Sequence, residues 1–391
     1  MCRKINTFKR NSFLFILFFS VLSLASLKGL ANGYEPVEHP AAATPEAAAN
    51  FDPGKLITEH IADGYGWHIA GEGQNAIAMP LPIILYSKER GLDVFLSNKF
   101  DHGHSTYNGY KLEGNHIVAV NEMDEMNSHL ATVNEELTAH LWDISITKNV
   151  FALLLSAFIL LWMFLTVAKA YKKGSNKAPK GLQSFVEPMI MFVRDDVAKN
   201  SIGPKYEKFM PYLLTVFFFI FINNLLGLVP LIPGCGANLT GNIAVCLVLA
   251  GLTLLITLIN SNGHYWRHIF AMPGVPIPVL IILTPIEILG VVLRPFVLMI
   301  RLFANITAGH IIGLAFFSLI FIFGQMSTGA GYGASVVSVL FTVFMGLMEL
   351  LVAFLQAYVF TLLSAIYIGS AIEEGHHDDH HHAENSKIDL V

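Results

Sequence analysis

The sequence predicts an all-α polytopic membrane protein with a small mixed α/β domain outside the membrane at its N-terminal end. Two observations lead to this fold class. Of the 391 residues, 54% are hydrophobic and only 14% are charged, which is typical of a chain that crosses a bilayer several times. The polar residues are concentrated in the first 147 positions and in a His/Asp/Glu-rich tail, and the stretch between them is mostly apolar.

Residues 1–31 have the pattern of a secretory signal peptide. Basic residues precede an apolar core at 13–27, and a small-x-small cleavage site follows at 29–31. The alternative is a short uncleaved anchor helix, for which the apolar core is short. In both cases the segment that follows should lie outside the cytoplasm.

Residues 32–147 are predicted to form the external domain. An Ala/Pro-rich linker occupies 35–50, and residues 82–87 and 92–97 flank Lys-Glu-Arg-Gly in the pattern of a β-hairpin. Residues 121–140 are polar and permit a helix. The histidines of this domain show no metal-ligand spacing, so they are interpreted as solvated surface residues.

Five later apolar segments are long enough to cross a hydrocarbon layer of ~30 Å. They span 149–168, 209–232, 242–262, 278–325 and 334–370. The last two are long, and the tight Gly-rich turn expected between them, 326–333, should make them antiparallel. An amphipathic segment, 181–200, is predicted to lie along the membrane interface. The membrane domain thus covers 148–372, and a His/acid-rich tail covers 373–391.

The distribution of Lys and Arg predicts the orientation. Residues 169–208 and the 263–275 loop are basic and are therefore expected in the cytoplasm, whereas the connections 233–241 and 326–333 carry no charge. Five spans then place the N-terminal domain in the periplasm and the C-terminal tail in the cytoplasm. The signal peptide leads to the same orientation independently.

The long apolar segments contain polar residues at mid-depth. Arg301 lies near the middle of one, where a charge costs at least ~2.5–3.5 kcal/mol and normally faces a partner, a cavity or an ion path. On a helix, Glu287 and Asn305 share one face with Arg301. The chain is therefore expected to handle charge inside a membrane.

In an antiparallel hairpin, residues placed symmetrically about the turn lie at equal depth. His310 and Glu349 are almost symmetrical about Gly329, and so are Arg301 and Gln356. On a straight helix, however, His310 lies about 180° around the axis from Arg301. Contact between His310 and Glu349 therefore requires a curved helix or a flanking cavity.

A histidine and a carboxylate at one depth are suited to relaying protons, because both can titrate near neutral pH when partly buried. The alternative is a buried ion pair that only locks two helices. Glu287 lies about 21 Å from Arg301 along an ideal helix, on the cytoplasmic side. The pattern therefore predicts two half-pathways for protons, separated by the fixed positive charge of Arg301.

The string Arg301-Leu-Phe-Ala-Asn305-Ile-Thr-Ala-Gly-His310 resembles subunit a of the F-type ATP synthase membrane sector. The likeness covers roughly 140–372 and includes Arg294-Pro295 and Leu355-Gln356. It implies that Arg301 is the family's essential arginine and faces the carboxylate of a rotating c-ring. Asn305 and Gln356 match polar residues beside it, and Glu187 matches an acid on the interfacial helix.

The resemblance implies a non-catalytic stator in the bacterial inner membrane. Its partners would be the c-ring, the peripheral-stalk b subunits, the remaining ATP synthase subunits and the lipid bilayer. The translocation residues would be Arg301, His310, Glu349, Gln356, Asn305 and Glu287. No cofactor, metal or nucleic acid is expected, and the chain has no phosphate-binding Gly-Lys-Ser/Thr loop for a nucleotide.

The sequence departs from many bacterial members at two places. The types of His310 and Glu349 are exchanged, as in mitochondrial relatives, and no acid is present near Thr240 in the external loop. The outermost part of the proton path and the role of residues 32–147 therefore remain open. That domain would either shape the mouth of the path or contact neighbouring stator helices.

Three other functions fit the sequence less well than a stator does. A self-contained ion-coupled transporter would predict internal repeats and discontinuous helices, and no repeat between the halves is present. An intramembrane metalloenzyme would need a His-Glu-x-x-His helix, which the sequence lacks. A purely structural scaffold would leave Arg301 unexplained.

Overall fold

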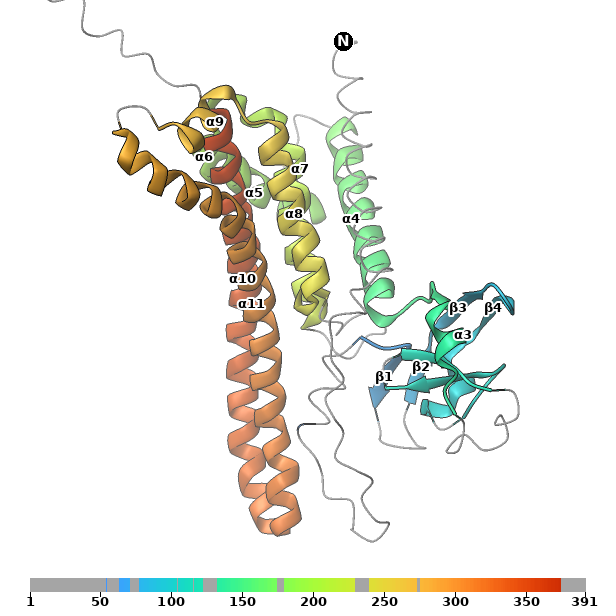
Figure 1. Cartoon of the computed structure of the whole chain (residues 1–391). Helices are drawn as coiled ribbons and strands as arrows, with labels where there is room; N and C mark the ends of the chain where they lie inside the picture. The colour runs from blue at the N-terminus through green and yellow to red at the C-terminus, as the bar shows by residue number, and fades with distance from the viewer. Residues whose placement is uncertain are drawn as a thin grey trace, which may run out of the picture.

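The computed structural model describes residue 54 and residues 63–70, 77–103, 105–114, 116–121, 132–173, 179–228, 239–272 and 275–373. Within these ranges a small β-rich domain precedes a set of long helices (Figure 1). The predicted signal peptide, the Ala/Pro linker and all of the tail beyond residue 373 lie outside the described residues.

The described part of the N-terminal domain contains three small antiparallel sheets. Their strands are β1 (Gly66–Ala70) with β2 (Ile77–Pro80), β5 (Tyr110–Glu113) with β6 (His116–Ala119), and β3 (Pro82–Ser87) between β4 (Gly91–Leu96) and β7 (Trp142–Asp143). The hairpin predicted at 82–97 is thus present as β3 and β4. Within the described part of 121–140, only the five residues of α3 (Glu135–Ala139) are α-helical.

The core of this domain follows from the alternation of side chains along β3. Ile83 and Leu85 point inward and are fully buried, where they join Phe100 and Tyr110 in one apolar cluster. The Tyr110 hydroxyl donates a hydrogen bond to Asp93 at 3.0 Å. The β5–β6 hairpin therefore packs on the inner face of the β4–β3–β7 sheet.

The N-terminal domain is hydrogen-bonded to the first turn of α4 (Lys148–Lys173). The backbone N–H of Lys148 donates to the Gly64 carbonyl at 2.9 Å, and that of Asn149 donates to the Asp63 carboxylate at 3.0 Å. Asp63 therefore satisfies a backbone donor that a helix start leaves free. These bonds fix the position of the domain relative to α4.

The remaining helices follow in chain order. They are α5 (Leu182–Phe192), which continues through a π-helical stretch (Val193–Lys199) into α6 (Asn200–Ile202), then α7 (Met210–Gly227), α8 (Ile243–Ile259), α9 (Gly263–Phe270), α10 (Ile277–Met326) and α11 (Thr328–Ile372). Within the described ranges four helices, α4, α7, α10 and α11, are long and apolar enough to cross a membrane. The number rises to five if α8 and α9, which are bent by 104°, form one span. The protein is therefore a mostly helical, multi-pass membrane protein.

The turn between the last two helices is shorter than predicted. Only Ser327 separates α10 from α11, and its side chain caps α11 by accepting from the backbone N–H of Ala330 at 3.1 Å. A Cβ on Gly331 would lie 2.9 Å from the Gly324 Cα. Gly331, which was expected in a loop, instead allows the first turn of α11 to approach the last turn of α10 closely.

The α10–α11 hairpin is the longest element of the molecule (Figure 1). A straight helix of the 50 residues in α10 would be about 75 Å long, more than twice the ~30 Å hydrocarbon layer. The hairpin must therefore lie oblique to the bilayer normal or extend beyond the bilayer. The first part of α10 bends away from α11, and this stretch contains Pro285 and Pro295, each of which removes a helical hydrogen bond.

The other end of α11 is locked against α6. A Cβ on Gly369 would overlap the backbone carbonyl of Ser201, so only glycine fits there. We expect Gly369→Ala to destabilise the helical part by about 1–3 kcal/mol or more, because backbone cannot move aside as a flexible side chain can. Thermal unfolding of the full chain in detergent micelles measures this.

Gly346→Ala is the matched control on the same helix, because a Cβ at Gly346 would meet no atom within 4 Å. This variant should unfold at or slightly above the temperature of the unaltered chain. Equal unfolding temperatures for the two variants would contradict the close approach of α11 to α6.

Candidate functional site

Arg301 lies on the open face of α10. Its side chain is exposed, as are those of Ala304, Asn305 and Ala308 on the same side of the helix. The opposite side of α10 is buried, with Leu302 in the apolar core of the helical part. Within the described ranges, Arg301 forms neither a hydrogen bond nor an ion pair.

Asn305 and Gln356 connect the two long helices one turn beyond Arg301. The Asn305 side-chain amide donates to the Gln356 Oε1 at 3.0 Å. Gln356 is buried, and its Nε2 has no hydrogen-bond partner among the described residues. The sequence predicted the depth of Gln356 relative to Arg301 but not this bond to Asn305.

His310 and Glu349 form the second connection between these helices. The His310 Nδ1 and the Glu349 Oε1 are hydrogen-bonded, with side chains that are 11% and 14% exposed. Gly309 allows the approach, since a Cβ there would lie 3.4 Å from the Glu349 Oε1. The pair thus faces the inside of the hairpin, whereas Arg301 faces outward, which matches the large rotation between His310 and Arg301 expected from the sequence.

Glu287 lies in the first part of α10, apart from these two pairs. Its side chain is half-buried. One turn further along, Val291 packs on the cluster of Tyr265 and Ile269 from α9. The guanidinium of Arg294 lies over the Tyr367 ring, 5.8 Å from its centroid. The structure thus brings together His310 with Glu349 and Asn305 with Gln356, but bonds neither Arg301 nor Glu287 to any of the other five predicted residues.

A buried polar chain beside Gln356 was not assigned a role from the sequence. The Thr240 hydroxyl donates to the Asn224 Oδ1 at 2.6 Å, and the Asn224 amide donates to the Ala353 carbonyl at 3.3 Å. Asn224 therefore connects α7 and the loop before α8 to α11, one turn from Gln356. The paired asparagines at 223 and 224 within an apolar run were the available signal.

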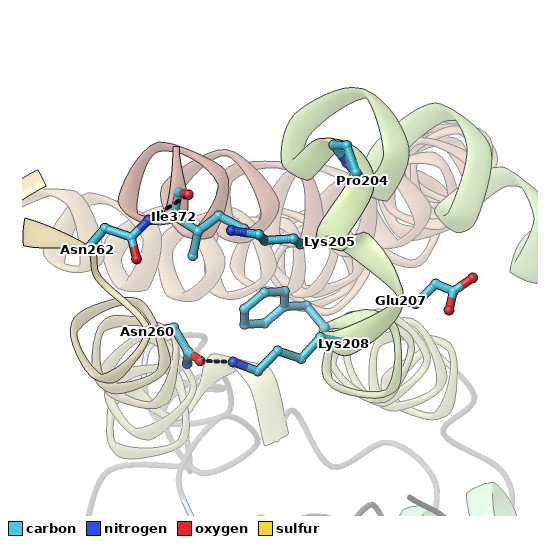
Figure 2. Close-up of a pocket in the computed structure, with 8 residues that line it drawn as sticks. Pro204, Lys205, Glu207, Lys208, Asn260, Asn262 and Ile372 are labelled. Atoms are coloured by element: carbon cyan, nitrogen blue, oxygen red, sulfur yellow. Dashed lines mark hydrogen bonds between the residues drawn. The ribbon is translucent and has the colours of Figure 1, made fainter. Parts of the chain in front are cut away.

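A cavity of about 420 Å³ lies at the opposite end of the helices (Figure 2). Lys208 reaches Asn260 across it at 2.5 Å, and the Asn262 amide donates to the Ile372 carbonyl at 2.9 Å. None of the six predicted translocation residues lines this cavity. Its polar bonds join the start of α7, the α8–α9 corner and the end of α11.

Two family models match this chain. Residues 150–369 match the family described as ATP synthase A chain. Residues 56–144 match a domain of unknown function, DUF8433. The boundary between the two matches falls at the connection from β7 to α4.

Curated relatives cover the same region. Over 248 residues the chain is 44% identical to ATP synthase subunit a of Chloroherpeton thalassium, an alignment that covers 62% of this chain and 71% of the relative. It is 47% identical to ATP synthase subunit a 2 of Chlorobaculum tepidum, covering 62% and 68%. ATP synthase subunit a of an Anaeromyxobacter species is 32% identical over 358 residues, covering 89% and 77%.

The contact between Asn305 and Gln356 can be measured by a double-mutant cycle. Replacing each with Ala, singly and together, should reveal a coupling of about 0.6 kcal/mol and at most ~1.7 kcal/mol, because hydrogen bonds between membrane helices are modest. The unfolding free energy of the full chain in bicelles is the measured quantity.

The matched control couples Asn305→Ala with Ser364→Ala. Ser364 lies on α11, like Gln356, but its buried hydroxyl bonds the Thr253 hydroxyl and not Asn305. This second cycle should give no coupling. A value of zero for the Asn305–Gln356 cycle would show that the bond contributes nothing to the hairpin.

Proposed function

Because the chain belongs to the ATP synthase A chain family, as subunit a of the F-type enzyme, we propose that it couples proton flow to rotation of a c-ring through two separate half-channels. Subunit a is a non-catalytic, proton-translocating part of the membrane sector. The assignment of residues to the proton path, the c-ring contact and the orientation in the membrane are the proposed parts.

The exposed and unpaired Arg301 is the observation that carries the proposal. A guanidinium at membrane depth is too costly to leave facing lipid, and this chain supplies no carboxylate to it within the described ranges. The small side chains of Ala304 and Ala308 beside it let another helix approach closely. A carboxylate on a c-ring helix satisfies both requirements.

His310 and Glu349 belong to the outer half-channel in this proposal. A proton reaches this pair from the periplasm, on the side where Asn224 and Thr240 provide further polar groups. It then neutralises a c-ring carboxylate near Arg301, and the neutral subunit rotates into lipid. Asn305 and Gln356 hold the two helices in register between the pair and Arg301.

Glu287 belongs to the inner half-channel. A c-subunit that arrives from the other side releases its proton toward Glu287 and the cytoplasm. Arg301 attracts the deprotonated carboxylate and prevents a proton from passing directly between the two paths. Each charge that crosses 100 mV supplies ~2.3 kcal/mol, so a direct leak would waste the gradient.

The proposed topology has five spans and one interfacial segment. The spans are α4, α7, α8 with α9, α10 and α11, and the interfacial segment is α5 with its π-helical continuation. The excess of Lys and Arg near α5 and α9 supports a cytoplasmic location for both, in a bacterial inner membrane. The N-terminal domain is then periplasmic, and the peripheral-stalk b subunits and remaining ATP synthase subunits complete the assembly.

Arg301→Ala is the decisive variant. We expect proton-driven ATP synthesis to fall to background while the complex still assembles, because the charge that separates the half-channels is lost. Synthesis in membrane vesicles energised by respiration measures the coupling. Arg267→Ala, which removes an exposed arginine on α9, should leave synthesis unchanged.

A scaffold and a self-contained transporter give different results. A scaffold would keep coupled synthesis in Arg301→Ala. A transporter would keep ion flux in vesicles that contain this chain without a c-ring. Either result would overturn the proposal.

Glu349→Gln distinguishes a proton relay from a pair that only locks two helices. The glutamine keeps an oxygen that accepts from His310 but cannot titrate at neutral pH. We expect proton flux through the assembled complex to fall by about tenfold or more with little change in unfolding temperature. Unchanged flux would assign His310 and Glu349 a structural role only.

A further inference from the structure

One face of the β4–β3–β7 sheet is apolar and open to solvent. The inner face carries Ile83, Leu85 and Phe95, which are buried in the domain core. The outer face carries six large apolar or aromatic side chains that are between 43% and 65% exposed. These six residues, the outer patch, are Tyr86, Leu92, Val94, Leu96, Trp142 and Ile144.

The strand register makes the outer patch continuous. Tyr86 pairs with Leu92 on one side and with Trp142 on the other. Two residues before Tyr86, Ile84 pairs with Val94. The Ile84 carbonyl also accepts a hydrogen bond from the backbone N–H of Ile144 at 2.9 Å. Along the described strands β3, β4 and β7, the side chains on this face are uncharged, and the charged residues 88–90 lie beyond them in the hairpin turn. A continuous apolar surface of this kind marks an interaction site.

The outer patch is held next to the start of a membrane span. Ile144 is four residues before Lys148, where α4 begins, so the two are at most about 14 Å apart along the chain. The backbone N–H of Ile146 donates to the Pro82 carbonyl at 3.0 Å, which fixes β3 to the same connection. In Figure 1 β3 and β4 lie at the level where α4 begins. The patch therefore lies at the level where a candidate membrane span begins.

We propose that the outer patch rests on the lipid surface from which α4 enters the membrane. Trp142 and Tyr86 are of the two residue types enriched at this depth, because their rings are apolar with a polar edge. The aliphatic residues Leu92, Val94 and Leu96 would face the boundary between headgroups and acyl chains. β7, which carries Trp142, leads directly into α4, so the short connection between them sets the depth of Trp142 relative to that of α4.

Site-directed spin labelling of the full chain tests this. Cys2, Cys235 and Cys246 are replaced with Ser, and a nitroxide is attached at Val94→Cys. The matched control is Glu113→Cys, an exposed position on the β5–β6 hairpin that packs on the opposite face of the sheet. Each labelled chain is reconstituted in vesicles of phosphatidylethanolamine and phosphatidylglycerol, where collisions with oxygen and with a water-soluble nickel chelate are measured.

At residue 94 we expect oxygen collisions to exceed nickel collisions, and at residue 113 we expect the reverse order. A label at 94 that behaves like the label at 113 would show a face open to water and would overturn the proposal. A label at 94 that is shielded from both reagents would show a protein contact and would also overturn it. The same order of collision rates should hold in native membranes that contain the assembled complex.

Discussion

The structure depends on the cost of placing the positive charge of Arg301 on an apolar helix without a partner among the described residues of the same chain. Leu298, Leu302 and Ile306 are buried on one side of α10, so Arg301 is presented on the other side and cannot turn inward without exposing them. Turning the helix would move these side chains from protein contacts to lipid, so the orientation is held by van der Waals packing rather than by transfer out of water. The charge therefore stays on the open face of α10, and in the proposed function a carboxylate of the c-ring faces it there.

The register of the α10–α11 hairpin determines where that charge stands. Two hydrogen-bonded side-chain pairs of the described residues cross the hairpin, His310 with Glu349 and Asn305 with Gln356, and both fall on the side of Arg301 toward the turn. At the other end, Gly369 fits against α6 with no room for a side chain. The hairpin is therefore fixed at both ends, and a slip of one residue would break both polar contacts together. Such a slip would also move Arg301 along the membrane normal relative to any rotor it faces.

Much of this arrangement could be predicted from the sequence, because it follows from periodicity and length. Apolar runs gave the helices to within a few residues in most cases, and symmetry about Gly329 gave the depth of the His310–Glu349 pair. What the sequence did not reveal depends on tertiary packing. The loop expected at 326–333 is helix because Gly324 and Gly331 allow contact there. The third span was predicted to end at 262, where α8 gives way to α9, but the angle of 104° between these two helices depends on packing. The bond of Gln356 to Asn305 also depends on how each helix is rotated about its axis, which symmetry about the turn does not determine.

The two matched families meet where the physical demands on the chain change. The domain before α4 has its own core, and water can supply hydrogen bonds to its exposed backbone groups. From α4 onward the backbone N–H and C=O groups must be hydrogen-bonded within the protein, because lipid offers no partners. At that boundary Asp63 accepts the N–H of Asn149, and Gly64 accepts that of Lys148, so the domain supplies acceptors that the first turn of α4 lacks. A flexible tether would have left those donors to solvent. The rigid joint instead makes the position of the domain a consequence of the position of α4, and any neighbour that α4 contacts therefore meets the domain at a fixed height.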